Sequence, residues 1–305
     1  MTKISVIIPC YYSEKTITCV VEETIREFEK LNNYDCEFIL VNDGSDDGTY
    51  REICELSEIY PFVTGVDFSK NFGQHNAIIA GMKLAKGDYI LGMDDDFQTH
   101  PSQISKLIQK IEEGYDVVYG KFPQRHHSVI RNIQSKISEL SANYLIDNPK
   151  DLKACPMYII RAFVKDEIVK SQSSYTNLRG LFLRTTSRIA NAEIEHFERK
   201  NGKSGYTFKK LMRLWGSYLN YSAKPVKLIR GFGVFTFIIG LIYLILSLVF
   251  QIPSVNIIAS EIMVFAGIII FILGLLGEYL VRLFMMSTNE PQYVIRSVTR
   301  EADDE

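Results

Sequence analysis

The chain has 305 residues, of which 34 are Lys or Arg and 36 are Asp or Glu, so its formal net charge at pH 7 is −2. A chain of this length exceeds a typical single domain, and a near-balanced charge argues against a nucleic-acid-binding protein, which carries a marked basic surplus. Five cysteines without a C-x-x-C pair predict reduced thiols, and not a disulfide framework or a zinc site.

Short apolar segments alternate with amphipathic ones along the first two thirds of the chain. The pattern predicts strands at 4–9, 36–41, 62–68, 89–93, 117–119 and 192–197, and helices at 16–31, 49–59 and 76–85. Because strands and helices alternate through short links, we predict an α/β fold, with a mostly parallel sheet and helices on both faces.

The strand at 89–93 ends in three adjacent carboxylates, Asp94, Asp95 and Asp96. Side chains two residues apart on an extended chain share a face, so we expect Asp94 and Asp96 to point together and Asp95 to point away. Like charges held this close favour a hard divalent cation between them, to which Gln98 could add a neutral oxygen. Open α/β sheets bind ligands at the carboxyl ends of their strands, which favours a metal site over a solvated acidic turn.

A second acidic strand end follows the strand at 36–41, in the segment Asn42-Asp43-Gly44-Ser45. The Asp43 carboxylate could accept hydrogen bonds from a nucleotide base or a ribose hydroxyl, or it could cap the next helix in an Asx turn. Neither G-x-G-x-x-G nor G-x-x-x-x-G-K-S/T occurs, so the metal, and not a helix N-terminus, would have to meet diphosphate charge. Two acidic ends in one sheet favour the nucleotide interpretation.

Residues 226–284 are far more hydrophobic than the rest of the chain. Residues 232–250 are uncharged and residues 257–283 nearly so, and each stretch is close to the ~20 residues that a membrane-spanning helix needs. Lys and Arg flank the outer ends of this hairpin and are absent from its loop, so the positive-inside rule puts both chain termini in the cytoplasm. The predicted organisation is an α/β domain at 1–205, a juxtamembrane amphipathic helix at 206–225, two transmembrane helices within 226–284 and a cytoplasmic tail at 285–305.

Four segments, in this order, resemble successive motifs of the inverting family 2 glycosyltransferases: IIPCY (7–11), VNDGS (41–45), NFGQHNA (71–77) and MDDDFQ (93–98). RKNGKSGY (199–206) is similar to the family's R-x-x-G-x-S-x-Y, and LLGEY (275–279) extends the likeness into the last hydrophobic segment. More narrowly, the chain resembles the polyprenyl-phosphate glycosyltransferases, such as dolichol-phosphate mannose synthase, bactoprenol glucosyltransferase and undecaprenyl-phosphate aminoarabinose transferase.

The resemblance implies a GT-A (Rossmann-like) fold and inverting transfer of a sugar, from a nucleotide-sugar such as a UDP-sugar to polyprenyl phosphate at the cytoplasmic face of the cell membrane. It also implies Mg²⁺ or Mn²⁺ as cofactor, the lipid bilayer as a partner, and a homo-oligomer, with a tetramer as one form. Carried over by position, it assigns nucleotide-sugar binding to Pro9, Tyr11, Glu14, Asp43, Asp94, Asp95, Gln98 and Ser204, metal binding to Asp94, Asp96 and Gln98, and catalytic roles to Asp94, Asp95, Asp96, Arg125 and Arg199.

The chain departs from the family pattern at three places. Ser13 stands where an acidic contact is usual, Thr99-His100-Pro101 replaces a proline pair, and the segment 151–156 departs most, with Asp151 the nearest candidate for an acidic role. Two other functions are compatible with parts of the sequence. A processive polysaccharide synthase typically carries Q-x-x-R-W and more spans, but no Q-x-x-R-W occurs here and only two spans are predicted. A non-catalytic membrane scaffold would not need the acidic strand ends to be intact.

Overall fold

A computed structural model describes residues 1–122, 149, 152–170, 177–195 and 291–300, and scattered positions between 258 and 283. The chain divides into two compact units, Met1–Ser217 with Pro291–Glu305, and Tyr218–Glu290. Among the described residues, no helix is both long and apolar enough to cross a membrane. The predicted span at 232–250 lies outside the described residues, as do the juxtamembrane helix and most of the second span.

The described part of the first unit contains one sheet in the order β7-β5-β6-β4-β1-β2-β3-β8. Its strands are β1 (Thr2–Cys10), β2 (Tyr34–Asn42), β3 (Val63–Phe68), β4 (Tyr89–Gly92), β5 (Val117–Lys121), β6 (Tyr158–Arg161), β7 (Ile189–Glu193) and β8 (Ile295–Val298). The four neighbours β4, β1, β2 and β3 are parallel to one another, whereas β6 and β8 run antiparallel to the strands beside them. The sheet is therefore mixed, with a parallel centre.

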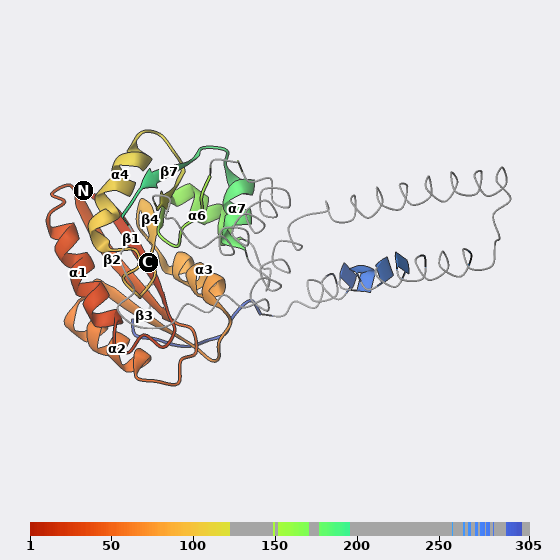
Figure 1. Cartoon of the computed structure of the whole chain (residues 1–305). Coiled ribbons are helices and arrows are strands. Elements are labelled where there is room, and N and C mark those ends of the chain that lie inside the picture. Colours follow the sequence, from red (N-terminus) through yellow and green to blue (C-terminus); the bar gives the residue numbers. More distant parts are fainter. Residues whose placement is uncertain are drawn as a thin grey trace. The chain divides into compact units, whose positions relative to one another are not determined.

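Helices cover both faces of this sheet, as the alternating pattern predicts (Figure 1). On one face lie α1 (Ile17–Glu29), α2 (Thr49–Ile59) and α4 (Ile104–Glu112), which follows the short 3-10 helix η1 (Pro101–Gln103), and on the other lie α3 (Gln74–Leu84), α6 (Ala162–Ile168) and α7 (Leu178–Thr185). In α1 the apolar residues Val20, Val21 and Phe28 recur at helical spacing and are buried against the sheet. Burial of such stripes fixes each helix on its face.

Three strands differ from the sequence prediction. The sequence prediction includes neither β6 nor β8. All four residues of β8 are partly or fully exposed, so β8 has no apolar pattern, whereas β6 buries three of its four residues but no motif marks it. The strand predicted at 192–197 is β7, Ile189–Glu193. The predicted bounds are wrong because pairing with β5 begins at Ile189 and ends at Glu193.

The register brings the carboxyl ends of the parallel strands to one edge of the sheet. Cys10 pairs with Asn42 at the ends of β1 and β2, whereas the β1–β4 ladder already ends at Ile7 and Gly92. The end of β1 therefore projects beyond β4, and Pro9, which has no N–H to donate, lies past the last β4 pair. Ligands of open α/β sheets bind at this edge, so the loops that follow these strands form the candidate site.

Candidate functional site

Asp43, the first residue after β2, is a buried anchor between two loops. Its Oδ1 accepts hydrogen bonds from the N–H groups of Phe72 (2.7 Å) and Gly73 (3.1 Å), and its Oδ2 accepts from Gly73 at 2.9 Å. Gly44 has φ +67°, and a Cβ there would lie 2.3 Å from the carbonyl carbon of Lys70. Only glycine allows this close approach, so the β2 loop and the β3–α3 loop are locked together.

Burial raises the pKa of the Asp43 carboxyl above its ordinary value of 3.8, and the N–H groups of Phe72 and Gly73 oppose the shift. The residue is only 3% exposed. A carboxylate offers about four acceptor positions, so the contacts that hold the loops leave capacity for one donor from a ligand.

The turn after β1 presents two aromatic rings to solvent. Tyr11 is 50% exposed and Tyr12 is 56% exposed, and their ring centroids are 4.6 Å apart in an edge-to-face arrangement. Tyr12 has φ 56°, an uncommon conformation for a residue other than glycine, and such strain gathers at functional sites. Its N–H donates to Oγ of Ser45 at 3.1 Å, which fixes the turn to the β2 loop. Sequence reasoning named Tyr11 and missed Tyr12.

Ser13 joins this turn to two other loops. It is 2% exposed, its N–H donates to Oγ1 of Thr49 at 2.8 Å, and its hydroxyl donates to Oδ2 of Asp95. The departure from the family pattern therefore has a structural consequence, because a carboxylate at Ser13 would lie directly against Asp95. A small hydroxyl donor fits this position.

The three carboxylates after β4 have three different partners. Because β4 ends at Gly92, they do not lie on an extended strand, and the expected alternation does not set their directions. Nε2 of Gln74 donates to Oδ1 of Asp94 at 2.7 Å, Ser13 donates to Asp95, and the N–H of Gln98 donates to Oδ1 of Asp96 at 3.0 Å. All three carboxylates are half-buried.

The Asp95 carboxyl is influenced by burial and by two neighbours, Ser13 and Asp96. Burial raises the pKa of its carboxyl, the hydrogen bond from Ser13 opposes the shift, and the neighbouring charge of Asp96 adds to it. Asp95 is thus a link between loops, which makes Asp94 and Asp96 the better placed pair for a ligand.

The donor atoms of Asp94 and Asp96 suit a divalent cation. Within the described residues, no group of three or more His, Cys, Asp or Glu side chains is arranged to hold a metal ion. Mg²⁺ in phosphate sites is typically held by one or two carboxylates and by oxygens of the substrate. Two half-exposed carboxylates on one loop fit that pattern.

An aromatic side chain, Tyr158, passes beside the end of β4. It pairs with Gly92 in the β4–β6 ladder, and a Cβ on Gly92 would lie 2.5 Å from the Tyr158 hydroxyl. Tyr158 is 4% exposed, and its hydroxyl has no hydrogen-bond partner in the part of the chain that the structure describes. Burial raises its pKa well above the ordinary value, and Tyr119 and Asp94 add to the shift, which puts Tyr158 close to the acidic loop. Sequence reasoning missed it, because no motif marks β6.

The remaining site residues are more scattered. Pro9 is buried within β1. The carboxylate of Glu14 lies 3.5 Å from the Arg51 guanidinium and beside Gly48, at the start of α2. Gln98 is half-exposed and uses its N–H to hold Asp96. The structure thus brings Tyr11, Asp43 and the three carboxylates at 94–96 to the carboxyl ends of the strands. Four of the predicted residues lie outside the described residues: Arg125, Asp151, Arg199 and Ser204.

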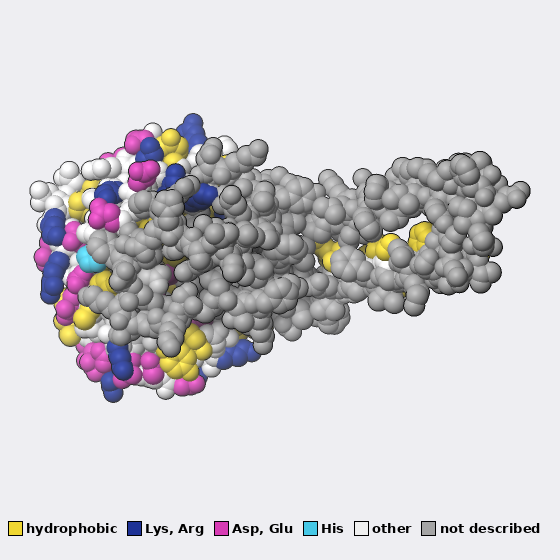
Figure 2. All heavy atoms as spheres, viewed as in Figure 1, with side chains coloured by type: hydrophobic (Ala, Val, Ile, Leu, Met, Phe, Trp, Pro, Cys, Tyr) yellow, Lys and Arg dark blue, Asp and Glu magenta, His cyan; other side chains and the backbone are white. Residues whose placement is uncertain are grey.

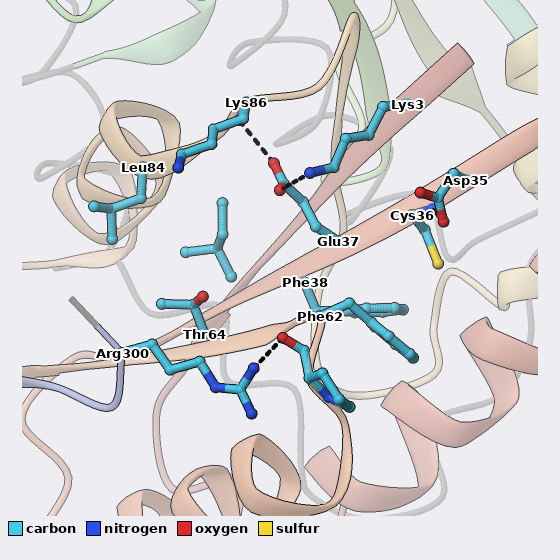
Figure 3. A pocket seen from close by; sticks show the side chains of 12 residues that line it. Lys3, Asp35, Cys36, Glu37, Phe38, Phe62, Thr64, Leu84, Lys86 and Arg300 are labelled. Carbon is cyan, nitrogen blue, oxygen red and sulfur yellow. Dashed lines mark hydrogen bonds and ion pairs between the residues drawn. The ribbon is translucent and has the colours of Figure 1, made fainter. Parts of the chain in front are cut away.

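A separate cavity of about 510 Å³ lies at the other end of the strands, where their amino ends meet. Residues near the amino ends of β1 and β2, including Lys3 and Glu37, line it together with Lys86 and Arg300 (Figure 3). Nζ of Lys3 lies 2.5 Å from Glu37, whose other oxygen accepts from the N–H of Lys86 at 2.7 Å. Because it opens at the amino ends of the strands, this cavity is not part of the candidate site.

The described surface carries both signs of charge. Figure 2 shows Lys and Arg side chains interspersed with Asp and Glu over the coloured part of one face, without a continuous basic patch among the residues described there. This mixture agrees with the near-zero net charge of the chain.

Residues 5–168 match the family model described as "Glycosyl transferase family 2". This match spans more than half of the 305 residues. The chain belongs to glycosyl transferase family 2. It is therefore a glycosyltransferase, as the four motifs indicate, and its mixed α/β sheet is of the GT-A kind.

Two relatives match nearly the whole chain, and so also the residues that the family model does not reach. The undecaprenyl-phosphate 4-deoxy-4-formamido-L-arabinose transferase of Proteus mirabilis (strain HI4320) is 30% identical, over 98% of this chain and 94% of that protein. The uncharacterized glycosyltransferase YkcC of Bacillus subtilis (strain 168) is 31% identical, over 96% of this chain and 93% of that protein. Among solved structures, the mannosyl-3-phosphoglycerate synthase of Rubrobacter xylanophilus has a similar fold, with a TM-score of 0.50, 14% identity and coverage of 74% of this chain and 75% of that chain.

Proposed function

We propose that this glycosyltransferase moves a sugar from a nucleotide-sugar, most simply a UDP-sugar, to undecaprenyl phosphate or a related polyprenyl phosphate, with inversion at the sugar. The product is a lipid-linked monosaccharide for modification of envelope glycans. The observation that carries the proposal is the extent of the match to a protein named undecaprenyl-phosphate 4-deoxy-4-formamido-L-arabinose transferase. That match covers 98% of the chain, and so includes the hydrophobic residues that the family model, ending at 168, does not reach.

The nucleotide half of the donor is proposed to bind across the turn after β1 and the loop after β2. The exposed rings of Tyr11 and Tyr12 offer a surface on which a base can stack, because every base presents a π-face. Asp43 keeps acceptor capacity for a base N–H or a ribose hydroxyl. Its anchoring of Phe72 and Gly73 presents both loops in one arrangement before the ligand arrives.

The diphosphate and sugar are proposed to lie over the acidic loop. Asp94 and Asp96, with Gln98 beside them, would hold Mg²⁺ or Mn²⁺, which when bound neutralises charge on the departing diphosphate. Ser13 holds Asp95 towards the β1 turn, and Gln74 orients Asp94 from the start of α3. These contacts fix the directions of the Asp94 and Asp95 side chains.

The acceptor phosphate needs little activation. A phosphate monoester has a second pKa of about 6 and is largely dianionic at neutral pH. Its oxygen forms the new bond to sugar C1 as the bond from C1 to the nucleoside diphosphate breaks, and the leaving group takes the electron pair. No proton has to leave the attacking oxygen, so the chain does not require a strong general base. Arg125 and Arg199 are proposed to meet the phosphate charges.

The proposed setting is the cytoplasmic face of the cell (inner) membrane, with a hairpin of helices at about 232–250 and 257–283 that keeps the enzyme beside its lipid acceptor. The support is the length and apolar character of these segments and the Lys and Arg that flank them. A homo-oligomer, with a tetramer as one form, belongs to the same proposal, and light scattering of the detergent-solubilised chain measures it.

The proposal is tested by incubating the full chain with undecaprenyl phosphate, Mg²⁺ and a panel of sugar nucleotides. We expect one donor to release nucleoside diphosphate only when the lipid is present, together with a lipid-linked sugar that contains one residue. A growing polymer would instead identify a processive synthase. If no donor in the panel turns over while nucleotide still binds, the function as a transferase to lipid phosphate is rejected in favour of a binding scaffold.

A further inference from the structure

The last described segment of the chain, residues 291–300, belongs to the same unit as the nucleotide loops. Its strand β8 pairs antiparallel with β3, so that Val298 faces Val66 and Ser297 faces Asp67. The next pair is Ile295 with Phe68, so the register shifts by one residue and Arg296 is the additional residue of a β-bulge. Bulges redirect a side chain at a sheet edge.

The redirected Arg296 side chain lies against a buried carboxylate. Its NH1 is 3.2 Å from Oδ2 of Asp67, and its NH2 donates to the carbonyl of Ser69 at 2.9 Å. The Asp67 side chain is only 4% exposed, whereas that of Arg296 is 63% exposed. A buried carboxylate needs charge compensation, because desolvation without a partner costs several kcal/mol. Arg296 provides it from the outer edge of the sheet.

Asp67 also connects Arg296 to the loop after β2, through a series of hydrogen bonds. Its Oδ1 accepts a hydrogen bond from Nδ2 of Asn42 at 2.7 Å, and Oδ1 of Asn42 accepts from the N–H of Ser45 at 3.2 Å. Oγ of Ser45 then accepts from the N–H of Tyr12 at 3.1 Å. Asn42 is 1% exposed, so its amide depends on these neighbours for its hydrogen bonds.

We infer that Arg296 is a positioning residue for the nucleotide half of the donor site: through Asp67 and Asn42 it fixes the loop after β2 and the strained Tyr12. The inference rests on the proposed function, because it assumes that a nucleotide binds at these loops. A network whose buried members all have partners holds one arrangement, and loss of an outer member leaves the inner groups free to rearrange. The segment that follows the hydrophobic part of the chain thereby sets donor affinity.

Arg300 offers a matched control on the same segment. Its guanidinium donates to the carbonyls of Pro61 and of Ser57, the latter at 2.7 Å, and it borders the cavity at the amino ends of the strands (Figure 3). Like Arg296, it ties residues 291–300 to the rest of the unit, in this case to α2 and to the loop between α2 and β3. It makes no contact with the chain of side chains that leads to Tyr12.

The test uses the full chain in detergent, with Arg296→Met, Arg300→Met and Asp67→Asn variants. Binding of UDP and of GDP is measured in the presence of Mg²⁺, together with KM for the donor and for undecaprenyl phosphate. We expect Arg296→Met to weaken nucleotide binding and raise donor KM about tenfold, with acceptor KM unchanged, because couplings through such networks are of order 1.4 kcal/mol. Arg296→Lys, which keeps the charge but loses one of the two contacts, is expected to lie between. Arg300→Met is expected to bind nucleotide like the wild type.

The outcomes separate the two proposals. If the wild-type chain binds neither nucleotide, the proposed function fails first. If it binds one of them and Arg296→Met binds within twofold of wild type, or if Arg300→Met weakens binding equally, the positioning role is rejected. Should Arg296→Met not fold, Asp67→Asn decides the question, because removing the buried charge must also weaken nucleotide binding about tenfold and must make a further Arg296→Lys change nearly silent.

Discussion

Asp43 and the loop Asp94-Asp95-Asp96 both follow parallel strands at the same edge of the sheet, yet the structure uses them differently. Asp43 is 3% exposed, and backbone N–H groups of another loop bind both of its oxygens. Asp94 and Asp96 are half-exposed, and Asp94 is held by a side chain of α3. Asp43 therefore holds the loops of the candidate site together, whereas the side chains of Asp94 and Asp96 remain partly exposed to solvent.

The largest expected effect comes from the accessible pair. Asp94→Ala or Asp96→Ala should lower kcat at least ~10²-fold, because each removes a group proposed to meet charge that develops on the leaving group. The free energy of unfolding should fall by no more than about 1 kcal/mol, since both residues are half-exposed and each accepts one hydrogen bond. Steady-state rates and urea unfolding measure the two quantities. Asp166→Ala, which changes an exposed carboxylate on α6, is the control; near-normal turnover in either site variant removes the metal assignment.

Asp43→Ala, in contrast, should chiefly lower the free energy of unfolding. It leaves the N–H groups of Phe72 and Gly73 without their acceptor, at a cost of about 1–3 kcal/mol in the free energy of unfolding. Asp43→Asn keeps an acceptor oxygen and should recover most of this loss. Urea unfolding of both variants provides the measurement, and an Asp43→Ala protein as stable as wild type contradicts the anchoring role.

The protonation of Asp43 should make the stability of the protein depend on pH. Burial raises the pKa of Asp43 in the folded protein, so the folded state binds this proton more tightly than the unfolded chain does. As pH falls through the raised pKa towards 3.8, wild type should therefore gain stability relative to Asp43→Asn. Nucleotide affinity should fall over the same window as the carboxylate is lost. Unfolding curves of both proteins at several pH values show whether the difference has this sign.

The smallest effect is expected at Tyr158. Tyr158→Phe removes a buried hydroxyl that has no partner among the described residues, so the free energy of unfolding should stay the same or rise by up to about 1 kcal/mol. Thermal unfolding measures this change. Gly92→Ala is the informative companion, because its Cβ would meet the Tyr158 ring at 2.3 Å and should destabilise the end of β4.

The sequence predicts most of the parallel part of the sheet and the helices that connect its strands. The strands β1 to β4 and the helices between them fall within a few residues of their predicted places, because each buries an apolar pattern of its own. The acidic strand ends were found for the same reason, since short polar segments directly after apolar runs mark the carboxyl edge of a parallel sheet. Local pattern therefore predicted the core of the sheet and pointed to the candidate site, and the resemblance of four motifs pointed to the family that the family model confirms.

The contacts of the candidate site residues, in contrast, depend on the tertiary structure. The sequence does not show that Ser13 meets Asp95, that Tyr158 lies beside Gly92, or that Arg296 reaches Asp67 from a strand more than 200 positions along the chain. Each of these contacts joins residues with no fixed spacing, and each depends on strand order, on register and on a single bulge. Periodicity reports which face of an element is buried, whereas the partner of a particular polar side chain is set by which elements the fold brings side by side.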